Sequence, residues 1–357
     1  MADQLEQDEQ VWRLPNKARG EDVRLGGGSR SSPLSPSAKA RLARIARGAP
    51  EVMVKITGRS RGVVHLKQHL DYITRNGRLQ AELQDGSKVE TRADLRALHD
   101  DWLAANILGE HGGHRPGAAQ SVGIILSMPE GTPPDRVHDA ARGWARTTLH
   151  NHDWLLVRHD DRGHPHVHVT VRAVGPTGKR LTAGPADLQR WRETFALELR
   201  RLGVEAEATP RKARGVVIKS AKSAVYRIER RGSESRVARR NQNEMTSSSG
   251  SNRSEWEAGI QARQQDIRAA YLARAEELEG GTADELRLAR DIRNFVAGMP
   301  VPLTSQQLLA SELKLARTGA GSPPLNCPSL YKGSQPQPSS PLKPRLPEPT
   351  CQNEPNR

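Results

Sequence analysis

Aromatic residues and cysteines are scarce in this chain of 357 residues, and each scarcity excludes something. Aromatic residues make up 3% of the sequence and hydrophobic residues 35%, too few for a core along the whole chain. We therefore expect a compact domain with disordered ends. The two cysteines, Cys327 and Cys351, lie in a Pro-rich segment, where they offer neither a disulfide framework nor a thiolate metal site.

Long apolar runs are also missing. No stretch reaches the roughly 18 apolar residues of a membrane span, and the N-terminus lacks an apolar signal core. We therefore expect a cytoplasmic protein with no membrane insertion. Positive charge, by contrast, is abundant, with a formal net charge of +14 and a pI near 10.3. Residues 211–240 hold eleven Lys and Arg against two Glu. This balance favours a polyanionic partner, with nucleic acid as the first candidate.

Hydrophobic periodicity predicts alternating strands and helices between residues 52 and 203. The strands are expected at 52–56, 121–127, 154–158 and 167–171, and the helices at 63–76, 92–108, 133–150 and 186–202. Gly58–Gly62 is expected to form a turn, and strands 154–158 and 167–171 a hairpin. The fold class that follows is α+β, with an antiparallel-rich central sheet flanked by helices, a basic helical region after it and disordered tails.

The expected domain plan has four parts: a disordered leader over 1–50, a folded domain over 51–215, a basic linker and helical region over 216–300, and a disordered Pro/Ser-rich tail over 301–357. Within the third part, the polar stretch 241–254 is expected to link to a helical pair at 255–297. The capping box at Thr282 and Glu285 marks the start of the second helix. A short helix is possible at 304–316.

Four histidines and two aspartates fall within ten residues, from His159 to His168. Side chains alternate faces along a strand, so His166 and His168 point the same way. In a hairpin around the loop 160–165, His159 would lie opposite His166. Three imidazoles on one face favour a divalent metal site over the alternative interpretation, a surface histidine cluster without a ligand. His164 lies in the loop, and we place it outside the set of metal ligands. Its alternative roles are a general acid or a contact to DNA.

Tyr72 is the only tyrosine before residue 226, and tyrosine can act as a covalent nucleophile. By itself, one tyrosine on a helix is more often a packing residue. Its neighbours change that reading. The segments 71–77, 124–132 and 159–169 resemble the three ordered motifs of HUH-type conjugative relaxases, the MobP-like mobilisation nucleases. The resemblance covers about residues 52–215, and the third motif is the most specific.

The resemblance implies a DNA relaxase that nicks and religates single-stranded DNA at the transfer origin of a plasmid or integrative element. Tyr72 would attack the scissile phosphate, forming a 5′-phosphotyrosine intermediate, and Ser127 would hydrogen-bond the DNA backbone. His159, His166 and His168 would hold a divalent metal, Mg²⁺ or Mn²⁺, although three imidazoles also admit Zn²⁺ or Ni²⁺. The implied partners are relaxosome accessory proteins and a type IV secretion coupling protein, and the protein could reach a recipient cell attached to DNA.

A carboxylate is expected to orient one of the histidines. Asp161 is the first candidate, and Asp160 remains a rival because Gly163 stands where such relaxases often have an acidic residue. The approximately fifty residues before the first strand are a second departure, because relaxases usually carry the nucleophile close to the N-terminus. Basic residues expected to contact DNA are Arg75, Arg172, Lys179, Arg180, Arg211, Lys212 and Arg214.

Three rival functions stay open at this point. A rolling-circle replication initiator shares the histidine chemistry, but it often carries a second tyrosine near the first, and Tyr226 is distant in sequence. A non-catalytic DNA-binding accessory protein of the transfer complex would not need Tyr72 and the histidine set. A simple metal-dependent hydrolase would not need Tyr72 either.

Overall fold

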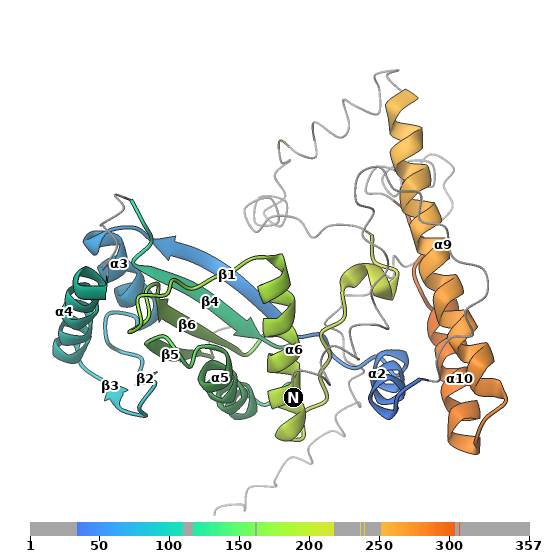
Figure 1. The fold of residues 1–357 in the computed structure, drawn as a ribbon, viewed down its shortest axis with the longest axis horizontal. Coiled ribbons are helices and arrows are strands. Elements are labelled where there is room, and N and C mark those ends of the chain that lie inside the picture. The colour runs from blue at the N-terminus through green and yellow to red at the C-terminus, as the bar shows by residue number, and fades with distance from the viewer. Residues whose placement is uncertain are drawn as a thin grey trace, which may run out of the picture.

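A six-stranded antiparallel sheet runs through the body on the left of Figure 1. The computed structural model describes residues 34–109, 117–160, 163–217 and 251–303, with the single residues 236, 239 and 307. The strand order is β1 (Met53–Ser60), β4 (Ser121–Ser127), β6 (His166–Arg172), β5 (Trp154–His159), β2 (Ala81–Leu83) and β3 (Lys88–Val89). Every neighbouring pair is antiparallel, which confirms the predicted α+β class.

Helices cover both faces of this sheet, and alternation along the strands separates two cores. Helices α5 (Pro134–Thr148) and α6 (Pro185–Arg201) pack on one face, against apolar residues that include Val167 and Val169. Helices α3 (Val63–Ile73) and α4 (Arg92–Gly109) pack on the other face, over β5 and β2. His166 and His168 therefore point to the α3 side of the sheet. We call residues 51–215 the sheet domain.

Three further helices form a second body, the helical module, which lies beside the sheet domain in Figure 1. It consists of α2 (Pro36–Ala46), α9 (Ser251–Glu279) and α10 (Ala283–Ala297). Their shared core contains Leu42, Ile45, Ile267, Tyr271, Ala275, Leu278, Leu288, Ala289, Ile292, Val296 and Met299. The predicted helical pair is confirmed, as is the capping box that begins α10.

Helix α2 differs from the expected leader. The sequence predicts disorder throughout 1–50, yet residues 36–46 form a helix whose N-cap is Ser35, with the Ser35 hydroxyl accepting from the backbone N–H of Ala38. The helix is stable because Leu42 and Ile45 pack in a core shared with α10. In addition, Lys39 forms an ion pair with Glu285 of α10 at 2.5 Å. A partner that far along the chain leaves no local pattern in the sequence.

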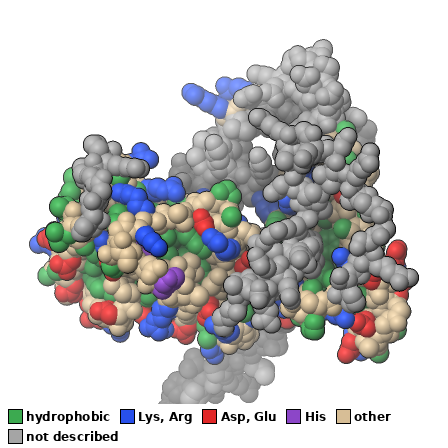
Figure 2. All heavy atoms as spheres, viewed as in Figure 1, with side chains coloured by type: hydrophobic (Ala, Val, Ile, Leu, Met, Phe, Trp, Pro, Cys, Tyr) green, Lys and Arg blue, Asp and Glu red, His purple; other side chains and the backbone are tan. Residues whose placement is uncertain are grey.

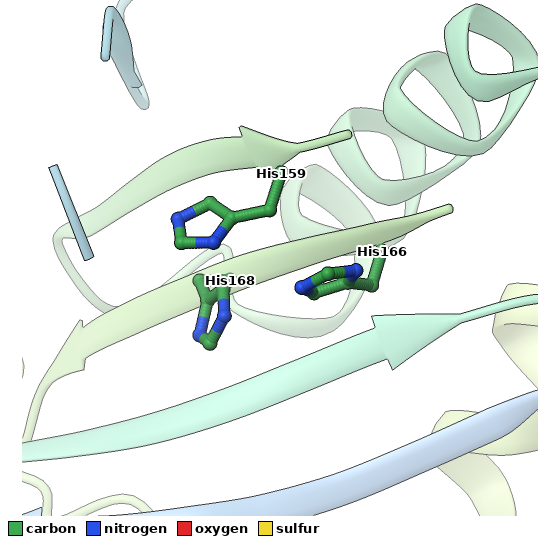
Figure 3. A group of neighbouring side chains, drawn as sticks. All are labelled: His159, His166 and His168. Atoms are coloured by element: carbon green, nitrogen blue, oxygen red, sulfur yellow. The ribbon is translucent and has the colours of Figure 1, made fainter. Parts of the chain in front are cut away.

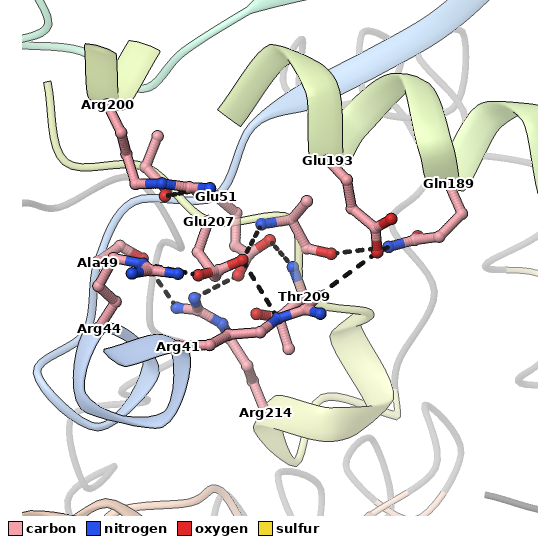
Figure 4. A network of polar contacts seen from close by, with 12 residues as sticks. Arg41, Arg44, Ala49, Glu51, Gln189, Glu193, Arg200, Glu207, Thr209 and Arg214 are labelled. Atoms are coloured by element: carbon pink, nitrogen blue, oxygen red, sulfur yellow. Dashed lines mark hydrogen bonds and ion pairs between the residues drawn. The ribbon is translucent and has the colours of Figure 1, made fainter. Parts of the chain in front are cut away.

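A buried ion-pair network docks the helical module on the sheet domain (Figure 4). Arg41 and Arg44 of α2 both reach Glu207, at 3.4 and 3.0 Å, and the Glu207 side chain is 4% exposed. From α9, the hydroxyl of Tyr271 donates to the carbonyl oxygen of Ala213 at 3.0 Å. Because these groups are buried and paired, the two bodies form a specific interface.

Other boundaries also differ from the sequence-based expectations. Strand β1 continues through Gly58, where a turn was expected, because a bulge between Ile56 and Gly58 lets the pairing with β4 resume. Strands β2 and β3 were not predicted, and α9 begins inside the expected linker. Most of 218–240 and nearly all of the possible helix at 304–316 lie outside the described residues. Among the described helices, none has the length and apolar content needed to cross a membrane.

Candidate metal and tyrosine site

The three predicted histidine ligands converge on the α3 side of the sheet (Figure 3). Strands β5 and β6 pair with His159 opposite His166, as the sequence predicts, and with Val157 opposite His168. The side chains of His159 and His166 are each 6% exposed, and His168 is half-buried. One ring nitrogen from each residue lies within 4.8 Å of the other two. The hairpin thus brings three imidazoles together.

Backbone carbonyls fix the proton positions on two of these rings. The Nε2 of His159 donates to the carbonyl oxygen of Ile73 at 2.6 Å, and the Nδ1 of His166 donates to that of His164 at 3.0 Å. A carbonyl only accepts, so in the neutral rings the lone pairs lie on Nδ1 of His159 and Nε2 of His166. Metal-binding histidines are oriented in this way in proteins. The donor set fits a divalent cation held by imidazole nitrogens.

Tyr72 shares a cavity with the histidines. It lies in the last turn of α3, and its side chain is 68% exposed. The cavity has a volume of about 410 Å³ and is lined by Asp71, Tyr72, Arg75, Asn76, Ile125, His159, His166 and His168. The predicted nucleophile and the predicted metal ligands, which are more than eighty residues apart in the sequence, therefore face one space.

Comparison with known proteins shows what this part of the chain resembles. Residues 72–201 match the family model described as Relaxase: MobA/VirD2-like, nuclease domain. This segment is therefore similar to a relaxase nuclease domain. A similar curated protein is the T-DNA border endonuclease VirD2 of Rhizobium radiobacter, 27% identical over 135 residues. That alignment covers 34% of this chain and 31% of VirD2, so the likeness concerns about a third of each protein.

The end of α3, directly after Tyr72, has an unusual backbone conformation. Arg75, Asn76 and Gly77 follow one another with positive φ angles of 51°, 61° and 76°. Gly adopts this region freely and Asn tolerates it, whereas it is uncommon for Arg, and residues held in such conformations gather at functional sites. The turn is held by Arg92, whose Nε donates to the carbonyl oxygen of Asn76 at 3.1 Å. As a result, Arg75 lines the cavity directly after the helix that carries Tyr72.

His69 also holds α3 on the sheet, and the sequence analysis did not single it out. Its Nε2 shares a hydrogen bond of 2.9 Å with the hydroxyl of Thr170, two residues beyond His168 on the same face of β6. The ring sits over Gly123, where a Cβ atom would lie only 2.9 Å from the Cε1 of His69. Burial lowers the pKa of His69, so the ring is neutral. A histidine three residues before a candidate nucleophile is the only signal the sequence offers.

Ser127 holds the loop that leads into the histidine strand. Its side chain is 5% exposed, and its hydroxyl donates to the carbonyl oxygen of Pro165 at 3.1 Å. The backbone N–H of Met128 donates to the same oxygen at 3.2 Å. Pro165 immediately precedes His166, so these two bonds fix where the ligand strand begins. In this geometry the Ser127 hydroxyl faces the protein.

The candidate carboxylates occupy different places. Asp161 lies outside the described residues. Asp160 is exposed and pairs with Arg158 at 2.8 Å. Glu130, which the sequence analysis did not consider, approaches the loop from the segment after β4. A Cβ atom added at Gly163 would lie 3.3 Å from the Glu130 carboxyl carbon, so a carboxylate does lie beside the position where such relaxases often have one.

The seven cations expected to contact DNA divide into three groups. Arg75 lines the histidine cavity. Lys179, Arg180, Arg211 and Lys212 are exposed. Arg172 is 3% exposed and pairs with Asp153 at 2.5 Å, and Arg214 pairs with Glu51, so both serve ion pairs within the fold. On the face in Figure 2, Lys and Arg side chains are spread over the sheet domain rather than gathered in one patch.

Proposed function

We propose that this protein is a site- and strand-specific DNA relaxase that nicks and religates one strand at the transfer origin of a plasmid or integrative element. The observation that carries the proposal is the cavity shared by Tyr72 and the three histidines. An exposed tyrosine at the mouth of a three-imidazole cluster suits covalent phosphoryl transfer, and the relaxase family match supports the same chemistry.

In the proposed reaction the phenolic oxygen of Tyr72 attacks the scissile phosphorus. The new bond joins that oxygen to phosphorus, the bond from phosphorus to the 3′ oxygen breaks, and the 3′ oxygen takes up a proton. The phenol loses its own proton, and the 5′ phosphate stays on the protein. Because one phosphodiester replaces another, attack by a 3′ hydroxyl reverses the step and religates the strand. No nucleotide energy source is needed.

His159, His166 and His168 hold a divalent cation in this proposal, with Mg²⁺ or Mn²⁺ as the first candidates. When bound, the cation supplies polarisation of the non-bridging phosphate oxygens, on which charge builds during transfer. Arg75 contacts a phosphate beside Tyr72. Ser127 acts as a positioning residue through Pro165, and a carboxylate from Asp160, Asp161 or Glu130 orients the loop that precedes the ligand strand.

The proposal extends to the surroundings of the enzyme. Initiation of conjugative transfer takes place in the donor cytoplasm, with relaxosome accessory proteins at the origin. A type IV secretion coupling protein then receives the DNA-linked protein, which enters the recipient with the strand. These partners rest on the family resemblance alone.

A labelling experiment tests the chemistry. Single-stranded oligonucleotides that tile the DNA flanking the protein's own gene are labelled at the 3′ end, on the fragment whose 5′ phosphate becomes attached to Tyr72. They are incubated with Mn²⁺ and resolved on a denaturing protein gel. We expect label to migrate with the wild-type protein and not with Tyr72→Phe. The matched control is Tyr271→Phe, which removes a buried hydroxyl remote from the cavity and should still form the adduct.

Each other outcome contradicts the proposal in a distinct way. Cleavage without attached label would indicate a metal-dependent hydrolase. An adduct that persists in Tyr72→Phe would place the nucleophile elsewhere. If the protein binds DNA but cleaves none of the tiled segments, a DNA-binding accessory protein is favoured, provided that His166→Ala leaves Mn²⁺ binding unchanged.

A further inference from the structure

A second cavity lies along the outer edge of β1, outside the histidine site. It has a volume of about 640 Å³ and is bounded by β1, α6 and the segment 209–216. Four of its lining residues are cationic, namely Lys55, Arg192, Arg211 and Arg214, and its one carboxylate belongs to Glu51. The excess of positive charge in a cavity of this size requires an explanation.

The carboxylate is already engaged inside the protein. Glu51 pairs with Arg214, and its second oxygen accepts from the backbone N–H of Thr209 at 2.8 Å. Arg214 in turn donates to the carbonyl oxygen of Ala49 at 3.0 Å. Glu51 and Arg214 therefore neutralise each other, and the remaining charge of the cavity comes from Lys55, Arg192 and Arg211.

Arg192 is the most informative of these cations. It is half-buried on α6, and its guanidinium has one long contact, to the carbonyl oxygen of Val54 at 3.5 Å. Within the described part of the chain, no carboxylate lies within ion-pair distance of it. Burial lowers the pKa of Arg192, which reflects the cost of removing its charge from water. A desolvated arginine without a carboxylate partner is suited to an anion from outside the protein.

Lys55 connects this cavity with the histidine site. On β1 it lies opposite Ile125 of β4, and Ile125 lies opposite His168 of β6. Residues directly opposite in a sheet share a face, so the three form one row across the sheet. Ile125 lines the histidine cavity and Lys55 lines the second one. With strands about 4.8 Å apart, the row spans about 10 Å from His168 to Lys55.

We propose that the β1-edge cavity is a second phosphate-binding subsite, in which Lys55 and Arg192 hold the backbone of the DNA strand beyond the scissile phosphate. The inference rests on the proposed function, because it places the same strand in both cavities. The subsite is sequence-independent: a lysine and an arginine contact phosphate oxygens, and no aromatic side chain lines the cavity to stack a base. It sets the register of the strand while Tyr72 reacts.

Salt dependence of binding tests the subsite directly. The probe is a fluorescent twenty-nucleotide oligothymidylate, and its affinity is measured by anisotropy across a range of NaCl concentrations. We expect Lys55→Gln and Arg192→Gln each to lower affinity and to reduce the slope of log affinity against log salt by about 0.7, the value for one single-strand phosphate contact. The matched control is Arg201→Gln, an exposed arginine of α6 outside the cavity, whose slope should match that of the wild type.

Unchanged slopes in both cavity variants would overturn the inference. Lys55 is exposed, so its substitution leaves the packed core intact, and its variant keeps the test decisive if Arg192→Gln folds poorly. The proposed function is judged separately by the Tyr72-dependent adduct. If the adduct forms and the slopes are unchanged, only the proposal of the subsite is contradicted. If the slopes change and no adduct forms, only the proposal of nicking activity is contradicted. If Arg201→Gln changes the slope as much as the cavity variants do, the effect comes from net charge alone, and the subsite is also contradicted.

Discussion

His159 and Ile73 are joined by a hydrogen bond of 2.6 Å between the ring Nε2 and the backbone carbonyl oxygen. Ile73 directly follows Tyr72, so this bond links a candidate metal ligand to the backbone of the candidate nucleophile. It also fixes the His159 tautomer, leaving the lone pair of the neutral ring on Nδ1. The relative position of the two reactive groups thus depends on a contact between a strand and a helix end.

Loss of a ring from the cluster should weaken metal binding strongly. We expect His166→Ala to weaken Mn²⁺ binding by more than about 100-fold, because even the loss of a group that merely orients a ligand costs about 10- to 100-fold. His164→Ala is the control. Its side chain is exposed, and only its backbone carbonyl serves His166, which the substitution retains. Isothermal titration calorimetry checks both, and equal affinities in the two variants would contradict the ligand assignment.

Gly123→Ala should disturb the contact between α3 and the sheet. The added Cβ atom would lie 2.8 Å from the Thr57 hydroxyl and 2.9 Å from the His69 ring, so one of them must move. We expect the free energy of unfolding to fall by about 1 to 3 kcal/mol, as in other overpacked sites. Urea unfolding measures it. Gly58→Ala in β1 is the control, because an added Cβ atom there meets nothing within 4 Å and the φ angle of Gly58 is not positive. No change in Gly123→Ala would contradict the packing of His69.

The buried ring of His69 should make stability depend on pH. Burial lowers its pKa in the folded protein, whereas an unfolded histidine takes up a proton near pH 6.5. Protonation thus favours the unfolded state, and stability is lost as the pH falls through about 6.5, at no more than about 1.4 kcal/mol per pH unit from one site. Comparing wild type with His69→Gln between pH 5.5 and 8 isolates this share. Parallel pH profiles would show that the ring is not buried neutral.

The interface around Glu207 should contribute strongly to stability. Glu207→Gln removes the carboxylate charge that pairs with both Arg41 and Arg44, and leaves Arg41 with Glu193 at 3.5 Å. We expect a loss of about 2 to 3 kcal/mol. The exposed pair of Arg47 with Glu205, 3.8 Å apart, provides the control. Glu205→Gln should change the free energy of unfolding by less than about 1 kcal/mol. Chemical unfolding compares the two, and equal effects would argue against a buried network.

Local patterns in the sequence were enough to predict the strands and the helix that hold the candidate site. Alternation along residues 154–171 was enough to predict that His159 lies opposite His166, because a hairpin around a short loop restricts the register. The spacing of apolar residues was enough to predict α3 and its end near Gly77. The meeting of Tyr72 with the histidines followed from family resemblance rather than from any pattern, since the two segments pair through tertiary packing alone.

The features that the sequence did not predict depend on distant partners. Strands β2 and β3 contain three and two residues, which are too few to show the apolar and polar alternation that predicts a strand. Arg172 reads as a surface cation in the sequence, but its ion pair with Asp153 exists only once β6 has formed. Ser127 reads as a polar residue at a strand end, and only the neighbouring Pro165 carbonyl reveals that its hydroxyl points inward.

The packing of α2 on α10 has a consequence for biosynthesis. Residues 36–46 leave the ribosome before any of the sheet domain, yet the apolar side of α2 meets residues as late as Val296 and Met299. Leu42 and Ile45 therefore stay exposed to solvent until the ribosome has translated the last turn of α10. A nascent chain of this protein can complete its sheet early, but α2 can pack on its partner only after α10 has been synthesised.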